Sequence, residues 1–274
     1  MTFRWLKGHG TENDFVLLDD PDGTVHGELA PEFVAALCDR RRGIGADGVL
    51  RVVRTVALGL PGEGEWFMDY RNADGSVSEM CGNGVRVFAR HLLETGLVDP
   101  QAPVVVSTRD GDKVVTRAED DELSVDMGGY EVRGTSLVEV PEGGSWKALD
   151  VRTGNPHAVA FVDDLAEAGA LREEPRHDAG TYPDGVNVEF VVRRGERHVA
   201  MRVHERGSGE TRSCGTGACA AAIATAVHDD AALPARYRVD LPGGTVHVDV
   251  RPGSRITLTG PAEIVAAGTM EWRR

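Results

Sequence analysis

Apolar and polar residues alternate along several short segments of the chain, the pattern of half-buried β-strands. The alternation is clear from Leu123 to Met127, and again from Val246 to Val250 after a Gly243-Gly244 turn. Because strands of this kind expose one face and bury the other, the pattern predicts hairpins in both halves of the chain.

Two other segments, each following a cysteine, have the apolar spacing of helices. Behind Cys81 the apolar positions are Val85, Phe88, Ala89, Leu92 and Leu93. Gly96 is placed to end that helix. Behind Cys214, residues 218–227 are apolar almost all round, apart from Thr225. A helix of this second kind must be buried on every side, so the pattern predicts a central helix wrapped by a sheet.

The chain also contains an internal repeat. Residues 81–84 and 214–217 both read Cys-Gly-x-Gly, and the two cysteines lie 133 positions apart (214 − 81). The same offset relates Met68 to Met201, Tyr70 to Val203, Gly111 to Gly244, Val115 to Val248, Leu123 to Ile256 and Val125 to Leu258. Agreement in register over that distance indicates a duplication.

The repeat predicts an α/β chain of the α+β type with two pseudo-symmetric lobes. Each lobe is expected to be a mainly antiparallel sheet wrapped around a central helix. The N-terminal lobe is predicted to span residues 1–117, with Cys81, and to be completed by residues 262–274. The C-terminal lobe is predicted to span residues 118–261, with Cys214.

The composition of the chain limits the class of binding partner and the cellular compartment that can be expected. The chain has 274 residues, 41% of them hydrophobic, enough to fill the core of one large domain or two ordinary ones. A net charge of −14 disfavours binding to nucleic acid or anionic membranes, so a small-molecule partner is expected. No apolar stretch approaches the roughly 20 residues of a membrane span, and residues 1–7 lack a signal-peptide pattern, which predicts a cytoplasmic protein.

The cysteines are the candidate chemistry. Four cysteines in a chain of this size do not resemble a disulfide framework, so reduced thiols are expected. A lone cysteine among glycines is more often structural than catalytic, but duplication at matched positions reverses that judgement for Cys81 and Cys214. A predicted helix start favours a thiolate at each, and its open amides suit a substrate carboxylate. Cys38 and Cys219 are predicted to be core residues.

Two such thiols suit the inversion of a carbon centre. Without a cofactor, inversion needs a base on one face and an acid on the other, and cysteine serves in both roles. The repeat therefore predicts an amino-acid racemase or epimerase in which one thiolate removes a proton and the other thiol delivers one.

Further motifs surround the two cysteines: Gly10-Thr11-Glu12-Asn13-Asp14-Phe15, Asn72-Ala73-Asp74-Gly75-Ser76, Gly154-Asn155-Pro156-His157, Gly185-Val186-Asn187 and Glu205-Arg206-Gly207-Ser208-Gly209-Glu210-Thr211. Together they closely resemble the family of diaminopimelate epimerases, with matches from the N-terminus to about residue 227. The resemblance implies interconversion of LL- and meso-2,6-diaminoheptanedioate, toward lysine and peptidoglycan precursors, by a homodimer without pyridoxal phosphate or metal.

The resemblance also assigns residues. It implies that Cys81 and Cys214 are the acid and base, and that His157 and Glu205 are linked to catalysis. The positions matching substrate contacts are Asn13, Asn72, Gly82, Asn83, Asn155, Asn187, Glu205, Arg206, Gly215 and Thr216. One departure is Gly48, where the family carries a polar side chain; a backbone group or a neighbouring residue is expected to replace that contact.

Other functions fit the residues less well. Residues 43–48 match a dinucleotide fingerprint formally, but they follow a predicted helix and lead into an apolar run, the reverse of the required order. No cysteine or histidine spacing indicates zinc. A thiol hydrolase using Cys214 with His157 or His204 leaves Cys81 unexplained, whereas a non-catalytic amino-acid-binding protein needs no thiols. A proline-type racemase is disfavoured by Asn187 and Arg206.

Overall fold

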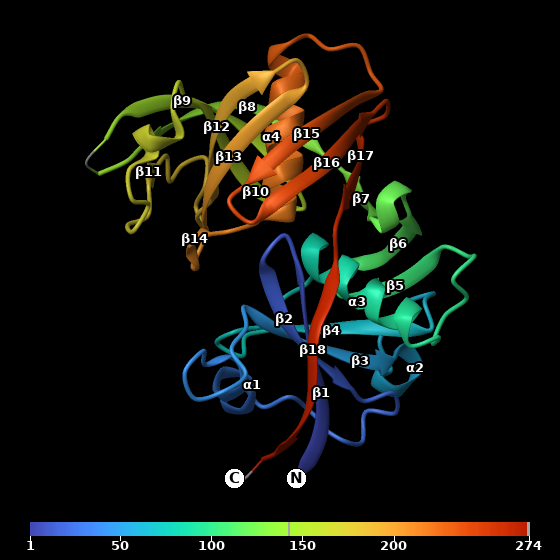
Figure 1. Cartoon of the computed structure of the whole chain (residues 1–274). Coiled ribbons are helices and arrows are strands. Elements are labelled where there is room, and N and C mark those ends of the chain that lie inside the picture. The colour runs from blue at the N-terminus through green and yellow to red at the C-terminus, as the bar shows by residue number, and fades with distance from the viewer. Residues whose placement is uncertain (142, 273–274) are drawn as a thin grey trace. The chain divides into compact units, whose positions relative to one another are not determined.

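The computed structural model describes residues 1–141 and 143–272, and the chain forms two compact units (Figure 1). Unit 1 comprises residues 1–125 and 260–274, and unit 2 comprises residues 126–259. The predicted lobe boundaries lie after residues 117 and 261, and they stay a prediction. The last two residues of the predicted 262–274 segment lie outside the described residues.

Unit 1 is built on a run of paired strands. Their order across the sheet is β18 (Glu263–Glu271), β1 (Thr2–Gly10), β2 (Asn13–Asp19), β3 (Gly48–Arg54), β4 (Trp66–Asn72), β5 (Val104–Thr108), β6 (Gly111–Arg117) and the start of β7 (Leu123–Gly129). The helical elements of unit 1 are α1 (Pro31–Cys38), α2 (Thr55–Leu58), α3 (Gly82–Glu94) and the 3-10 turn η1 (Glu119–Asp121).

Unit 2 repeats this plan. Its strand order is β8 (Glu131–Glu139), β9 (Ser145–Thr153), β10 (Asn155–Phe161), β12 (Asn187–Gly195), β13 (His198–Glu205), β15 (Ala235–Leu241), β16 (Gly244–Arg251) and β17 (Arg255–Gly260). Its helix is α4 (Gly215–His228), and its smaller elements are η2 (Leu165–Ala168), β11 (Arg176–His177) and β14 (Gly209–Thr211).

The pairing directions are the same in the two units. Along each order the pairs are antiparallel, antiparallel, parallel, antiparallel, parallel, antiparallel and antiparallel. The sheet of unit 1 begins with a strand from the other end of the chain, since β18 pairs with β1, as the red and blue strands of Figure 1 illustrate. In unit 2 the first strand, β8, directly precedes its partner β9 in the chain. The repeated topology agrees with a duplication.

Each sheet surrounds one helix. Helix α3 contacts strands β1 to β6 and β18, and helix α4 contacts β9, β10, β12, β13, β15 and β16. Helix α4 is buried from Gly215 to Ala226 except at Thr216, because its side chains are small and apolar. The predicted α/β fold with two central helices is thus confirmed. The expectation of burial along the whole apolar run is wrong at Val227, which is 50% exposed near the end of the helix.

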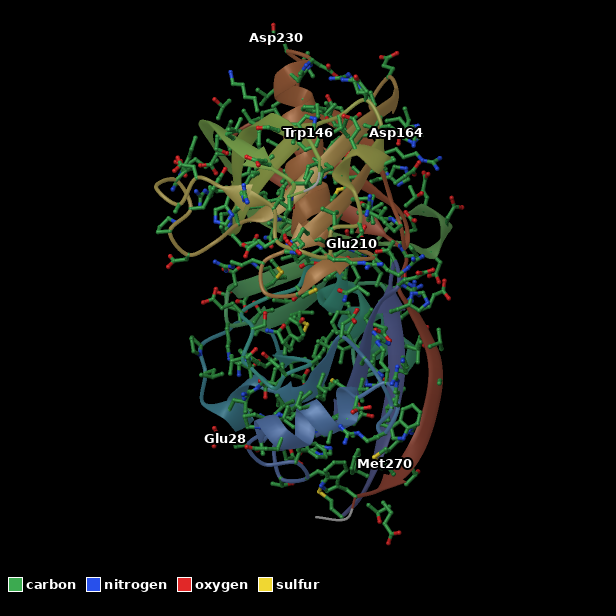
Figure 2. All side chains as sticks on the ribbon, turned by 90° about the vertical axis from the view of Figure 1, so that its left-hand side faces the viewer. Glu28, Trp146, Asp164, Glu210, Asp230 and Met270 are labelled. Atoms are coloured by element: carbon green, nitrogen blue, oxygen red, sulfur yellow. The ribbon has the colours of Figure 1, made fainter. Side chains whose placement is uncertain are left out.

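Apolar clusters back the sheets in both units. In unit 1 helix α1 contributes Val34, Leu37 and Cys38 to a core cluster, with Met270 of β18 packed against it (Figure 2). In unit 2, Trp146 of β9 packs against a second cluster that includes Phe190. The predicted core positions of Cys38 and Cys219 are confirmed, since both side chains are buried. No helix of the described residues has both the length and the apolar character that a membrane crossing requires.

Candidate active site

Cys81 is the N-cap residue of helix α3. Its backbone is extended, with φ −144° and ψ 120°, and its sulfur accepts a hydrogen bond from the backbone N–H of Gly84 at 3.4 Å. A Cβ at Gly84 would make ordinary van der Waals contact with the Cys81 Cβ, at 3.4 Å. The sulfur thus lies at the positive end of the helix dipole, where a thiolate is favoured.

Asn13, at the start of β2, is the side-chain partner of Cys81. The thiol donates to Asn13 Oδ1 at 3.5 Å, and Asn83 Nδ2 donates to the same oxygen at 3.2 Å. Asn83 is in turn fixed by Arg86, whose Nη2 donates to Asn83 Oδ1 at 2.9 Å. Arg86 is fully buried, so its guanidinium holds the first turn of the helix from within unit 1.

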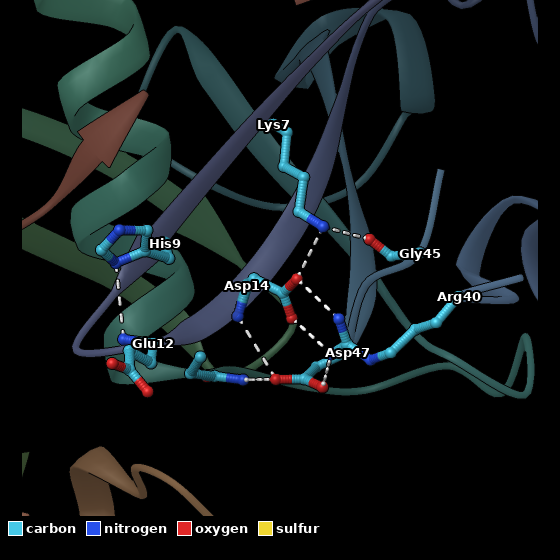
Figure 3. A network of polar contacts seen from close by, with 8 residues as sticks. Lys7, His9, Glu12, Asp14, Arg40, Gly45 and Asp47 are labelled. Atoms are coloured by element: carbon cyan, nitrogen blue, oxygen red, sulfur yellow. Dashed lines mark hydrogen bonds and ion pairs between the residues drawn. The ribbon is translucent and has the colours of Figure 1, made fainter. Parts of the chain in front are cut away.

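The amide of Asn13 is oriented by Asp47, which belongs to a network of charged residues with Lys7, Asp14 and Arg40 (Figure 3). Asn13 Nδ2 donates to Asp47 Oδ2 at 2.8 Å, and Arg40 pairs with both Asp47 and Asp14 at 2.7 Å. Lys7 adds a second cation, with Nζ 2.9 Å from Asp14 Oδ2. Because Asp47 takes the amide nitrogen of Asn13, the amide oxygen is left to face Cys81.

Gly48 begins β3 beside this network. A Cβ there would lie 2.5 Å from the Arg71 carbonyl oxygen and 2.6 Å from the Tyr70 ring, so this backbone has no room for a side chain. The neighbouring Asp47 does carry a polar side chain, and it accepts hydrogen bonds from Asn13 and Arg40. Asn72 lies directly across the sheet from Gly48, and its Nδ2 donates to Ser76 at 3.0 Å.

Cys214 is the N-cap residue of helix α4, matching Cys81 in unit 1. Its sulfur accepts from the Gly217 N–H at 3.3 Å and lies 3.5 Å from the Thr216 hydroxyl. Cys214 is only 6% exposed. Burial raises the pKa of this thiol well above its usual value, and the carboxyl groups of Glu205 and Glu189 add to the rise.

A buried acid–imidazole pair lies in the same unit. His157 Nδ1 is 2.6 Å from Glu189 Oε1, and His157 Nε2 is 2.9 Å from Asn155 Oδ1. Both His157 and Glu189 have no exposed surface. Burial raises the pKa of Glu189, which the contact with His157 opposes and the charge of Glu205 reinforces.

The remaining predicted residues of unit 2 lie at strand ends and in the following loops. Asn187 Oδ1 accepts from the Arg206 backbone N–H at 2.9 Å, and Thr211 donates its hydroxyl hydrogen to Glu205. The Arg206 side chain is exposed and donates from Nη1 to the Asp184 carbonyl oxygen at 3.0 Å. This guanidinium therefore remains open to a ligand on its other edge.

The pairing register of the parallel strands shows which residues of unit 1 are equivalent to which residues of unit 2. Phe15 pairs with Gly48 in unit 1 as His157 pairs with Asn187 in unit 2. Counting from these pairs, Asn13 corresponds to Asn155 and Leu50 corresponds to Glu189. Each unit therefore carries an asparagine and an N-cap cysteine at equivalent places, although the sequence offset between the asparagines differs from that between the cysteines.

Sequence reasoning missed Glu189 and gave Asp47 no specific role. The available signal for Glu189 was a single acid within the otherwise apolar run 188–192. For Asp47 the available signal was its position alone, one residue before Gly48, where the family carries a polar side chain.

Two rival site types gain no support from the described residues. His204 neighbours Glu205 in a strand, so alternation directs its side chain to the opposite face from Glu205. The Cys214 sulfur contacts the Thr216 hydroxyl and the Gly217 N–H. Within residues 1–141 and 143–272, no three His, Cys, Asp or Glu side chains are grouped as metal ligands. A surface hollow in unit 1, lined in part by Leu60, Phe67 and Arg109, includes none of the predicted site residues.

Comparison with known proteins decides the family. The model of the family "Diaminopimelate epimerase" matches residues 5–132 and 150–265. This chain belongs to the diaminopimelate epimerase family. The resemblance drawn from the motifs is therefore confirmed.

Curated family members match over nearly their whole length. A diaminopimelate epimerase of Streptomyces coelicolor is 57% identical, covering 97% of this chain and 95% of the relative. Another, of Thermobifida fusca, is 48% identical over 97% of each chain. A third, of Mycolicibacterium smegmatis, is 46% identical, covering 97% of this chain and 96% of its own.

Solved structures of more distant proteins share the fold. A Bacillus anthracis phenazine biosynthesis protein of the PhzF family superposes with a TM-score of 0.73 at 17% identity, covering 99% of this chain and 100% of its own. A hydroxyproline epimerase from Agrobacterium vitis gives a TM-score of 0.67 at 15% identity, covering 98% and 92%. At these identities the likeness concerns the fold alone.

Proposed function

We propose that this chain interconverts LL- and meso-2,6-diaminoheptanedioate, with Cys81 and Cys214 as its acid–base pair. Membership of the diaminopimelate epimerase family supports the reaction. The observation that carries the mechanism is that each unit holds a cysteine outside any disulfide at a helix N-cap, with a backbone N–H directed at its sulfur.

The chemistry proceeds by one proton removal and one proton delivery. One cysteine, as thiolate, takes the α-proton and becomes a thiol, leaving the electron pair on the α-carbon and its carboxylate. The other cysteine, as thiol, gives its proton to the opposite face and becomes a thiolate. Helix-end N–H groups stabilise the charge that develops on the carboxylate. We propose that neither pyridoxal phosphate nor a metal takes part.

Substrate contacts follow from the donors and acceptors of each side chain. Arg206 can bind a carboxylate bidentately, and Glu205 can accept from an ammonium group. Asn13, Asn72, Asn83, Asn155 and Asn187 supply neutral donors and acceptors. The backbone N–H groups of Gly82, Gly215 and Thr216, in the first helical turns, suit a carboxylate. His157 and Glu205 are proposed to assist the thiols.

The cellular setting is part of the same proposal. A homodimer acting in the cytoplasm, on a free small molecule rather than on nucleic acid or membrane, fits a step toward lysine and peptidoglycan precursors. The net charge of −14 supports the small-molecule partner.

The decisive experiment is incubation of the purified chain with LL-diaminoheptanedioate and no added cofactor, followed by chiral analysis. We expect the meso form to appear. In heavy water we expect the product to acquire deuterium at the inverted carbon, because thiol protons exchange with solvent. An inverted product that keeps all of its original hydrogen would contradict the two-thiol scheme, and no inversion at all would contradict the proposed substrate.

A further inference from the structure

A buried carboxyl group lies beneath the start of helix α4. Glu189 has no exposed surface, and its Oε2 has no hydrogen-bond partner among the described residues. A Cβ built on Gly217 would lie 2.8 Å from Glu189 Oε1 and 3.3 Å from the Cys214 sulfur. The carboxyl group is therefore packed directly against the helical turn that carries Cys214.

The other unit shows that the fold does not require this acid. At the equivalent place in β3 unit 1 has Leu50, which is fully buried. A Cβ built on Gly84 would lie 3.4 Å from Leu50 Cδ2 and 3.6 Å from the Phe15 ring, so an apolar pair fills the space beneath Cys81. Burying a carboxyl group costs free energy of folding. Since the fold accepts leucine at this place in unit 1, glutamate at the same place in unit 2 does not add to stability.

Glu189 also helps to hold the imidazole ring of His157 in one orientation. One proton lies between His157 Nδ1 and Glu189 Oε1, 2.6 Å apart, and His157 donates a second from Nε2 to Asn155 Oδ1 at 2.9 Å. With both ring nitrogens engaged, the imidazole is held in one orientation. Phe15, the counterpart of His157 in unit 1, offers no hydrogen bond.

We propose that Glu189 is a positioning residue for the acid–base step at Cys214, holding the His157 ring and keeping the Cys214 sulfur protonated in the absence of substrate. The inference rests on the proposed function of Cys214. The charged and titratable groups around Glu189 are His157 of β10, Glu205 of β13, Cys214 of α4 and Tyr182 of the preceding loop. Of these only His157 supplies a partner charge of opposite sign.

The consequence is that the two catalytic thiols are unequal. Negative charge beside a thiol disfavours its thiolate, and Cys214 is exposed to the carboxyl groups of both Glu205 and Glu189. The apolar pair beneath Cys81 exerts no such effect. Replacing Glu189 should therefore favour the thiolate at Cys214 and leave Cys81 unchanged.

The test compares Glu189→Leu, which copies unit 1, with Glu189→Gln, which keeps the shape and a hydrogen bond to His157. Leu50→Met is the matched control, since it changes packing beneath Cys81 without changing charge. Each variant is labelled with a small methanethiosulfonate reagent over a pH series, and peptide mass spectrometry reports each cysteine separately. Thermal unfolding verifies folding, and kcat and KM are measured with diaminoheptanedioate.

We expect Glu189→Leu to lower the labelling midpoint of Cys214 by about one pH unit, with a smaller shift in Glu189→Gln and none at Cys81. We expect kcat to fall by about 10- to 100-fold in Glu189→Leu while KM changes by less than about threefold. Leu50→Met should move neither midpoint.

An unchanged Cys214 midpoint in folded variants would overturn the inference, as would equal shifts at both cysteines. A shifted midpoint with unchanged kcat would also overturn it, because Glu189 would then have no part in the reaction. If Glu189→Leu does not fold, the same criteria, the Cys214 midpoint and kcat, are applied to Glu189→Gln. The labelling does not depend on turnover. A chain that is inactive toward diaminoheptanedioate would therefore contradict the proposed function without deciding the inference about Glu189.

Discussion

The two units have the same strand topology but different interiors beneath their helices. Helix α4 is lined with alanine and other small apolar residues, whereas α3 buries Arg86, Arg90 and His91. Each of these three has polar partners: Arg86 bonds Asn83, Arg90 bonds the Ala262 carbonyl, and His91 bonds Asp19. These polar groups of unit 1 lie along helix α3 itself, whereas His157 and Glu189 of unit 2 lie in strands β10 and β12.

The thiols differ accordingly. Cys81 faces a neutral amide, Asn13, which is held by the exposed network of Asp47 and Arg40. Cys214 is buried near two carboxyl groups. A duplicated fold can therefore keep a cysteine at the same helix position while its surroundings diverge, because the backbone amides that contact the sulfur belong to the shared architecture.

The largest effect is expected from removing either thiol. Cys81→Ala and Cys214→Ala should each reduce kcat for epimerisation by about 1,000-fold or more, since each removes one of the two proposed proton-transfer groups. Cys219→Ala, within the same helix as Cys214, serves as the control and should keep most of the activity. Chiral chromatography of the product measures all three; a strongly active Cys81→Ala would mean that unit 1 supplies no acid or base.

The next effect concerns a charge cluster of unit 1. Asp69 is fully buried and contacts Arg51, Arg71 and Arg109. Burial alone would raise its pKa, but the three arginines, Arg109 foremost, lower it below its usual value. Asp69→Asn should lower the free energy of unfolding by about 3–5 kcal/mol in urea titrations, because it leaves buried guanidinium groups without their anion.

The control for this variant is a surface pair in unit 2. Arg133 Nε contacts Glu131 at 2.8 Å, with both side chains more than half exposed. Arg133→Ala should therefore change the free energy of unfolding by less than about 1 kcal/mol. Equal losses in the two variants would contradict the cluster's structural role.

A third prediction tests how Asn13 is held. Asp47→Ala removes the acceptor that directs the Asn13 amide, so the oxygen facing Cys81 is no longer fixed. We expect kcat/KM to fall by about tenfold, equivalent to one lost charged hydrogen bond. Asp47→Asn, which keeps an acceptor oxygen, should recover part of the loss. If both variants have the wild-type rate, Asn13 is oriented by other groups.

The smallest effect is a pH dependence of stability. Burial opposes ionisation of Asp14, but hydrogen bonds from Arg40 and Lys7 lower its pKa below the usual value of 3.8. Because the folded pKa is depressed, the stabilisation is present above the unfolded value and is lost as the pH falls through the folded value.

Asp14→Asn should therefore destabilise the chain by about 1–2 kcal/mol at pH 7 and by less near pH 3, measured by urea unfolding at both pH values. Asp240 provides the comparison in unit 2, since His198, Arg238 and Thr245 bring its pKa to about 2 against the effect of burial. Asp240→Asn should show the same sign. A loss that is equal at pH 7 and pH 3 would assign the Asp14 contribution to packing instead.

The sequence by itself determined the repeat, the two helices and the strands that follow them. Local pattern suffices for these, because a strand or helix must bury one face and the spacing of apolar residues records which face that is. The cysteines were also accessible from sequence, since Cys-Gly-x-Gly at both helix starts leaves a recognisable signature. The family motifs added the other predicted positions, whose roles remain proposals.

Only the tertiary structure decided which residues meet beneath the helices. Glu189 and His157 are 32 positions apart in the chain, and Asn13 and Asp47 are 34 apart, so no periodicity connects them. Their contacts arise because β10 pairs in parallel with β12, and β2 with β3, and a parallel connection brings together distant segments. Sequence pattern fixes each element's buried face, whereas the register between strands sets which side chains share it.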